Sequence, residues 1–332
     1  MLRYILHRLL LLIPTLLAIS LVTFVIIQLP PGDYLETLMT ELQAAGEKAD
    51  LQKLEFLRTQ YGLDQPLWVQ YWTWLTGLLR GDLGYSFEYD RPVSAIIGER
   101  LLLTFVVSLG AILFTWVVAF PIGVYSATHQ YSWADHALTF LGFLGLATPD
   151  FLLALVLMFI SFTWFGVSVG GLFSPGMETA PWGWAKIVDL LQHLWIPVLV
   201  IGSSGTAGMI RRLRANLLDE LKKPYVVTAR AKGLSPGRLL VKYPLRIALN
   251  PFISDIGNLL PEVVSGSIIV SIVMSLATTG PMLLRALRSQ DMYLAGSFLM
   301  LLAVLTVVGI FLSDLALAVL DPRIRQGAGR SR

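Results

Sequence analysis

Residues 101–128 read LLLTFVVSLGAILFTWVVAFPIGVYSAT and contain no Asp, Glu, Lys or Arg. A helix needs roughly 20 predominantly apolar residues to cross the hydrocarbon core of a bilayer, and this run is longer than that. Five other stretches share the absence of charge: Leu9–Leu29, Phe151–Met177, Leu190–Ile210, Val263–Leu284 and Met292–Ser313. Together they predict six membrane-spanning helices, at about residues 9–30, 101–127, 137–165, 191–211, 248–276 and 294–319.

The composition also indicates a membrane protein. Of the 332 residues, 55% are hydrophobic and 14% are charged, whereas an ordinary soluble domain carries about 25% charged residues. The chain has no cysteine, which excludes disulfide bonds, thiolate metal sites and a cysteine nucleophile. Its four histidines are too scattered to indicate a metal site. The predicted fold class is therefore an all-α integral membrane protein with six transmembrane helices.

The distribution of charge predicts which ends of these helices face the cytoplasm. Residues 211–246 contain 10 Lys or Arg and 2 Asp or Glu, whereas residues 31–99 contain 5 and 11. Basic residues near span ends are enriched on the cytoplasmic side, and Arg3, Arg8 and the arginines after residue 320 agree with the basic loop if there are six spans. Both termini are then cytoplasmic and residues 31–99 external. The first apolar run has 21 residues, more than the apolar region of a signal peptide, and is interpreted as a retained span.

These boundaries divide the chain into four parts: residues 1–30 with the first span, the external segment 31–100, the transmembrane core 101–320 and the cytoplasmic tail 321–332. The core includes the basic loop, residues 212–247. In the external segment, residues 51–61 have the pattern of a short amphipathic helix, and an aromatic stretch follows that contains Trp68, Tyr71, Trp72 and Trp74. Aromatic side chains favour the membrane–water interface. The stretch is interpreted as an interfacial anchor, with a docking surface for an external partner as the alternative.

The basic loop contains start and stop signals for two short helices. Pro224 suits the first turn of a helix, because its missing N–H would be unpaired there in any case. Gly233 can supply the left-handed residue that ends this helix. Ser235 followed by Pro236 is typical of the start of another. We therefore expect a helix at about residues 224–232.

Two interpretations of this helix follow from its residues. The small side chains of Ala229 and Ala231 would let it approach another protein closely, and Arg230 and Lys232 could reach acidic groups on that partner. Alternatively, the loop is a solvated segment whose positive charge only fixes the topology.

The run Tyr225–Ser235 resembles the cytoplasmic loop motif of permease subunits in ATP-binding-cassette (ABC) importers, in particular those of the oligopeptide/dipeptide/nickel family. Six further segments extend the resemblance over nearly the whole chain: Met1–Pro14, Pro31–Asp33, Tyr61–Pro66, Gly77–Gly84, Arg91–Val93 and Leu320–Arg325. The general importer motif begins Glu-Ala-Ala, and the corresponding residues here are Val227, Thr228 and Ala229. Such a departure is usual in the peptide branch of the family.

The resemblance implies a type I ABC importer permease fold, with a small external insertion between the first two helices, in the plasma (inner) membrane of a prokaryote. It implies a transport subunit, not an enzyme, that translocates a solute delivered by an external substrate-binding protein. Peptides are the expected solute, and oligosaccharides and nickel are the alternatives. The other implied partners are a second, homologous permease and two cytosolic ATPase subunits, which would bind ATP and Mg²⁺. No cofactor is expected in this chain.

The resemblance also assigns a set of residues to the contact with the ATPase subunits: Tyr225, Thr228, Ala229, Arg230, Lys232, Gly233 and Leu234. The sequence contains no Gly-Lys dipeptide, so it cannot form the glycine-rich loop in which a lysine contacts the phosphates of ATP. ATP hydrolysis is therefore expected from a partner, and no catalytic or metal-binding residue is predicted.

Three polar residues of the fifth predicted span, Asp255, Asn258 and Glu262, are spaced i, i+3 and i+7, so they share one face of a helix. A carboxylate at the centre of a membrane costs about 2.5–3.5 kcal/mol. This face is therefore expected to avoid lipid. It would either line the translocation path or pair with the partner permease. An interfacial position near the cytoplasm is the third alternative and applies best to Asp255.

Three other functional classes are alternatives to the importer. Gly202-Ser203-Ser204-Gly205 matches the nucleophile turn of a serine protease, which needs a base within hydrogen-bond reach. No histidine follows His193, which lies in the same span, so small residues that permit close helix packing are the preferred interpretation. An ATP-independent secondary transporter is the stronger alternative, although no internal repeat supports it. A membrane-assembly scaffold is a weaker one.

Overall fold

The computed structural model describes residues 2–29, 59, 62, 64–166, 170–254 and 267–320. The chain divides into two compact units: Met1–Leu103 with Thr278–Arg332, and Thr104–Ala277. Helix α5 (Val93–Thr128) begins in the first unit and continues into the second. The predicted helix at residues 51–61 lies outside the described residues, apart from Thr59.

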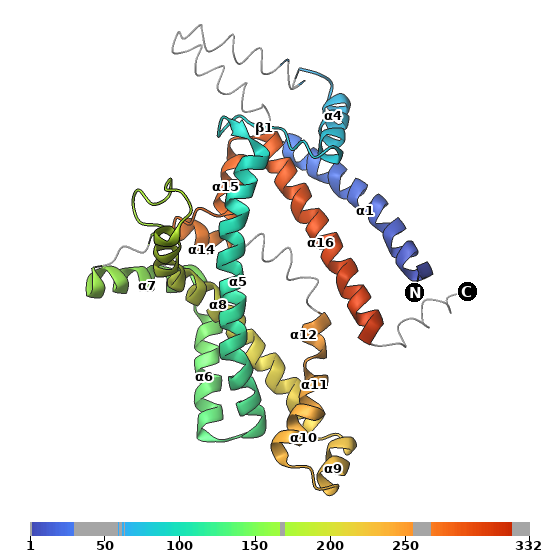
Figure 1. Ribbon diagram of the computed structural model, residues 1–332, viewed down its shortest axis with the longest axis vertical. Helices are drawn as coiled ribbons and strands as arrows, with labels where there is room; N and C mark the ends of the chain where they lie inside the picture. The colour runs from blue at the N-terminus through green and yellow to red at the C-terminus, as the bar shows by residue number, and fades with distance from the viewer. Residues whose placement is uncertain are drawn as a thin grey trace. The chain divides into compact units, whose positions relative to one another are not determined.

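Among the described residues, the helices long and apolar enough to cross a membrane are four: α1 (Leu2–Gln28), α5, α8 (Trp184–Leu221) and α16 (Met292–Leu320). They cover the predicted spans at 9–30, 101–127, 191–211 and 294–319 (Figure 1). The predicted span at 248–276 begins with α12 (Asn250–Ser254) and ends with α14 (Ile268–Val273). The residues between these two helices lie outside the described part of the chain. The count of six spans therefore stays a prediction.

The third predicted span, 137–165, is not one straight helix. It consists of α6 (Trp133–Ala147) and α7 (Asp150–Phe165), which meet at an angle of 97°. Taken together, the two helices are long and apolar enough to form a fifth candidate span among the described residues. The break lies at Thr148, whose ψ of 120° is extended. A residue before proline is pushed out of the helical region by the proline ring, and Pro149 follows. The apolar run alone did not indicate this break.

In the first unit, the aromatic stretch divides into two groups of side chains. Helix α4 (Leu67–Leu79) carries all four residues, and its Tyr71 hydroxyl lies 2.9 Å from Ser20 Oγ of α1. Trp74 is buried, whereas Trp68 and Trp72 are 69% and 56% exposed. The side of α4 that carries Tyr71 and Trp74 therefore packs within the first unit. The side that carries Trp68 and Trp72 is exposed, as the predicted interfacial anchor requires.

A small hairpin of the first unit is fixed by a buried carboxylate at the start of α16. Strands β1 (Tyr85–Ser86) and β2 (Arg91–Pro92) pair antiparallel. Asp291, which is fully buried, accepts hydrogen bonds from Ser86 Oγ at 2.5 Å and from the backbone N–H groups of Glu88 and Leu294. Burial raises the pKa of Asp291, against the lowering effect of these bonds. Helix α15 (Thr279–Arg288) precedes this site.

In the second unit, α5 and α8 approach closely at glycine. A methyl group on Gly202 would lie 2.6 Å from Phe114 Cδ1 and 3.1 Å from the carbonyl oxygen of Ala111. Thr115 Oγ1 donates to the carbonyl of Gly202 at 3.0 Å. The Ser203 hydroxyl donates within its own helix, to the carbonyl of Val200. The Gly-x-Ser-Gly motif therefore serves helix packing, in agreement with the preferred interpretation.

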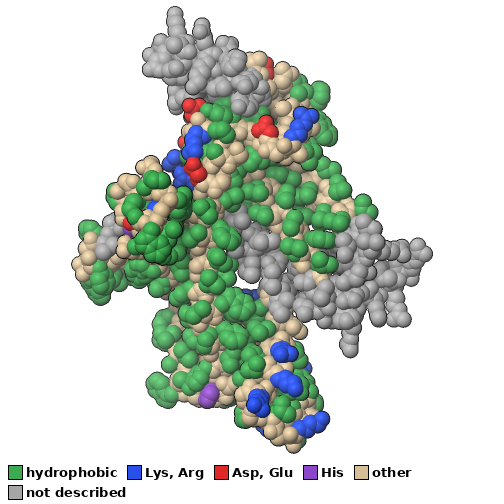
Figure 2. All heavy atoms as spheres, in the orientation of Figure 1, with side chains coloured by type: hydrophobic (Ala, Val, Ile, Leu, Met, Phe, Trp, Pro, Cys, Tyr) green, Lys and Arg blue, Asp and Glu red, His purple; other side chains and the backbone are tan. Residues whose placement is uncertain are grey.

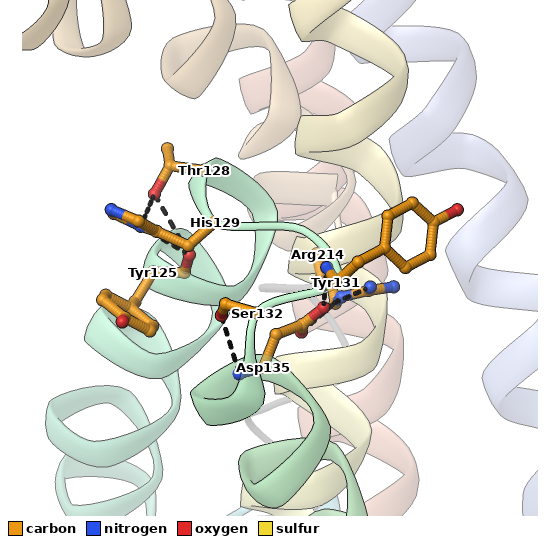
Figure 3. A network of polar contacts seen from close by, with 7 residues as sticks. All are labelled: Tyr125, Thr128, His129, Tyr131, Ser132, Asp135 and Arg214. Carbon is orange, nitrogen blue, oxygen red and sulfur yellow. Dashed lines mark hydrogen bonds and ion pairs between the residues drawn. The ribbon is translucent and has the colours of Figure 1, made fainter.

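A buried ion pair fixes the start of α6 to α8 (Figure 3). Arg214 donates from Nε and from a terminal nitrogen to the two oxygens of Asp135, at 3.0 and 2.8 Å. Asp135 is 1% exposed, and it also accepts from the backbone N–H of Tyr131. The Ser132 hydroxyl accepts from the N–H of Asp135 and caps the helix.

The contact at Gly202 can be tested with a matched pair of glycine substitutions. Gly202→Ala should lower the free energy of unfolding, since overpacking costs about 1–3 kcal/mol, more than the helix propensity gained. Gly208→Ala, in the same helix with nothing within 4 Å of the added methyl, should raise it by up to about 1 kcal/mol. The measurement is the midpoint of unfolding by SDS in mixed micelles. Equal midpoints for the two variants would contradict the close approach of α5 and α8.

The ion pair predicts a large effect of removing its cation. Arg214→Ala leaves a buried carboxylate unpaired, which should lower the free energy of unfolding by about 3 kcal/mol in the same assay. Arg211→Ala, at an exposed position of the same helix, should change it by less than about 0.5 kcal/mol. If the two variants unfold alike, the pair does not hold α6 on α8.

Candidate partner-binding site

The basic loop folds into short helices at the end of α8. Helix α9 (Pro224–Ala231) has Pro224 in its first turn, after Lys223 in an extended conformation. Gly233 has a φ of +81°, the left-handed conformation that a glycine adopts without strain. Helix α10 (Pro236–Lys242) begins after Ser235, and α11 (Pro244–Ala248) begins at the next proline. The predicted helix is thus confirmed, one residue shorter at its end.

One face of α9 is buried against α10. Val226 and Ala229 are 1% and 6% exposed and pack on Leu239 of α10, with the partly buried Tyr225, Leu234 and Tyr243 around them. We call these six residues the α9–α10 core. Within this chain, the packing of α9 on α10 covers the methyl group of Ala229, and the predicted contact of Ala229 with another protein stays a prediction.

The opposite face of α9 is exposed and carries small or apolar side chains. We call this the outer face; it consists of Pro224, Val227, Thr228 and Ala231. Val227 is 62% exposed, and it lies one helical turn before Ala231, so the two share a strip of the surface. Gly233, at the end of the helix, has open space where a side chain would begin. Thr228, Ala231 and Gly233 are thus accessible, as the contact with a partner requires.

Exposed cations lie on α9 and along the rest of the basic loop. Seven basic residues follow α8, and all are exposed: Lys222, Lys223, Arg230, Lys232, Arg238, Lys242 and Arg246. No Asp or Glu occurs between Leu221 and Ser254, and within the described part of the chain none of the seven forms an ion pair. Figure 2 shows Lys and Arg gathered over α9 and α10. The surface therefore complements an acidic partner.

The helix α8 carries this surface away from the apolar part of the unit. The uncharged run of α8 ends at Ile210, but the helix continues to Leu221. At about 1.5 Å per residue, this extension is roughly 16 Å long. The polar headgroup layer on each side of a bilayer is only about 5–8 Å thick. The outer face of α9 is therefore expected to lie in water beyond the headgroups.

The predicted polar face of the fifth span stays a prediction, because Asp255, Asn258 and Glu262 lie outside the described residues.

Near α9, the structure shows a contact that the sequence did not indicate. The Tyr225 hydroxyl donates a hydrogen bond to Glu220 of α8. The two residues lie in different helices, so no helical spacing could have revealed the contact.

Comparison with known proteins gives matches along the whole chain. Residues 119–326 match the family described as binding-protein-dependent transport system inner membrane component, and residues 1–109 match the N-terminal part of such membrane components. An oligopeptide transport system permease protein of Bacillus subtilis is 34% identical over 97% of this chain and 98% of its own length. A putative peptide permease protein of Brucella ovis is 35% identical over 98% and 99%. A glutathione transport system permease protein of Salmonella choleraesuis is 32% identical over 98% and 99%.

The multi-pass helical architecture and the two family matches lead to the same conclusion. The chain belongs to the family of binding-protein-dependent transport system inner membrane components, as an ABC importer permease of the peptide branch.

Proposed function

We propose that α9 is the element through which this permease couples to an ATPase partner. The observation that supports it is the outer face of α9, a small apolar surface in a loop with seven exposed cations, at the end of a helix that extends beyond the apolar run. Burying this face against an acidic groove would pair the cations and cover Val227 and Ala231. A loop that only fixed the topology would not need a folded core beneath it.

Contacts beyond α9 supply a path from this surface to the spans. Helix α11 packs against α8 and α5 through a buried cluster: Ala119, Ala127, Met209, Ile210, Leu213, Leu217, Leu245, Ala248 and Phe252. The guanidinium of Arg212 lies 5.2 Å from the ring of Phe252. Close-packed interiors transmit displacement because they have little free volume. A movement of α9 driven by ATP binding and release would therefore be passed to α8 and α5.

The transported solute is proposed to be a peptide. This rests on relatives over nearly the whole chain that are named for oligopeptide, peptide and glutathione transport. Oligosaccharides and nickel remain the alternative solutes within the same class of importer. The assembly would contain this chain, a second homologous permease, two ATPase subunits that bind ATP and Mg²⁺, and a substrate-binding protein.

The proposed topology has six spans in the plasma membrane, with both termini and α9 in the cytoplasm and residues 31–99 outside. The excess of basic residues in 211–246 supports this orientation. In this arrangement, Asp255, Asn258 and Glu262 would face the translocation path, away from lipid.

Substitution in the outer face of α9 tests the coupling. Ala231→Trp should reduce solute uptake per ATP hydrolysed by about tenfold, because overpacking of a fitted contact costs about 1–3 kcal/mol. Ala231→Ser, which keeps the side chain small, should couple normally. The measurements are uptake and ATP hydrolysis by the reconstituted complex, after co-purification shows that all subunits are present. Normal coupling in the Ala231→Trp complex would refute the assignment.

The orientation can be tested by cysteine labelling, since the natural chain has no cysteine. A membrane-impermeant maleimide should label Asp64→Cys in intact cells and Ala231→Cys only in inside-out vesicles. Both positions are exposed, so a difference between them would report the side of the membrane. Labelling of Ala231→Cys in intact cells would contradict a cytoplasmic α9.

A further inference from the structure

We infer that Tyr225 is a positioning residue, whose hydrogen bond to the Glu220 carboxylate fixes α9 to α8 so that the two helices move as one body. The inference rests on the proposed function, in which α9 receives the movement of the ATPase subunit. The ring of Tyr225 packs in the α9–α10 core. The positioning role therefore belongs to its hydroxyl group, which contacts α8.

The backbone between α8 and α9 is short. Lys222 ends α8 in a helical conformation, whereas Lys223 is extended, with φ of −70° and ψ of 145°. The N–H of Lys223 donates to the carbonyl of Glu220 at 3.2 Å. Because Pro224 restricts the residue before it to extended conformations, a rotation of α9 about the end of α8 would occur at Lys222.

The packing of the region restrains α9 through α10. The α9–α10 core and the buried cluster that joins α11 to α8 and α5 share no residue, but Leu240 of α10 packs against that cluster. Val226 and Ala229 contact α10 and are therefore carried along with it. A direct side-chain contact between α9 and α8 would add a second restraint on the angle between these two helices.

Tyr225 and Glu220 make that contact. The hydroxyl of Tyr225 donates to Oε2 of Glu220, and its ring centroid lies 6.4 Å from that of Tyr243. Tyr225 is half-buried. Burial and the neighbouring carboxylate raise the pKa of Tyr225 to about 12, so the hydroxyl keeps its proton at physiological pH. Hydrogen bonds to charged groups are among the stronger ones in proteins.

The test compares variants that remove this bond with variants that keep it. Tyr225→Phe and Glu220→Ala remove it, whereas Glu220→Gln keeps a carbonyl acceptor. Tyr243→Phe is the matched control, since within the described part of the chain the Tyr243 hydroxyl makes no hydrogen bond. The double variant Tyr225→Phe/Glu220→Ala should be no worse than either single one, because both remove one interaction.

Two readouts are taken on the assembled complex. The first is the distance distribution between spin labels at Ala215→Cys of α8 and Val241→Cys of α10, both at exposed positions, which should broaden when the bond is removed. The second is uptake per ATP hydrolysed, which should fall by at least about threefold in the same variants, since a bond to a charged group shifts an equilibrium by about tenfold or more. Glu220→Gln and Tyr243→Phe should leave both readouts near those of the natural complex.

The outcomes distinguish this inference from the function on which it rests. If Ala231→Trp uncouples the complex and Tyr225→Phe leaves distances and coupling unchanged, the role of Tyr225 is wrong and the docking surface stands. If neither variant changes the coupling, the proposed function itself is wrong. Broadened distances with reduced coupling in Tyr225→Phe and Glu220→Ala, and not in Glu220→Gln, would support both.

Discussion

The continuous helix α8, from Trp184 to Leu221, is the constraint on which the second unit depends. Its glycine at 202 admits α5, and its Arg214 neutralises the buried Asp135 at the start of α6. Its last turns extend beyond the apolar run and end where α9 begins. Because the backbone hydrogen bonds along a helix are made within the segment itself, one element can pass from hydrocarbon to water. The same helix therefore supports both the packing of the spans and the presentation of the basic surface.

Different faces of α9 serve the folding of the helix and the proposed binding of a partner. Val226 and Ala229 stabilise the short helix by packing against α10, and Val227 and Ala231 remain exposed on the opposite face. Isolated helices of eight residues are unstable in water, and α9 exists because α10 covers its other side. Helix α10 connects the two cores, because Leu239 lies in the core beneath α9 and Leu240 packs against the buried cluster of α8, α5 and α11. The proposed bond from Tyr225 to Glu220 adds a direct contact between α9 and α8 at the junction.

The sequence predicted features that local chemistry controls and missed those that depend on tertiary contacts. Pro224, Gly233 and Ser235-Pro236 marked the boundaries of α9 and α10 correctly, because proline and glycine act through their own backbone preferences. The apolar run at 137–165 concealed the bend at Thr148, since hydropathy does not register a change in direction. The sequence could not distinguish Ala229 from Ala231, because only the position of α10 decides which small residue of α9 is covered within the chain. The hydrogen bond between Glu220 and Tyr225 depends on the turn between two helices, which composition does not specify.

The most direct measurement of the central claim is a cysteine crosslinking scan along α9 in the complete transporter, read as covalent adducts with the ATPase subunit. Coupling through the outer face of α9 predicts adducts from Val227, Thr228 and Ala231. It predicts few or none from Val226 and Ala229, which α10 covers. Adducts with no such periodicity, or none from the outer face in a complex that transports normally, would contradict the account.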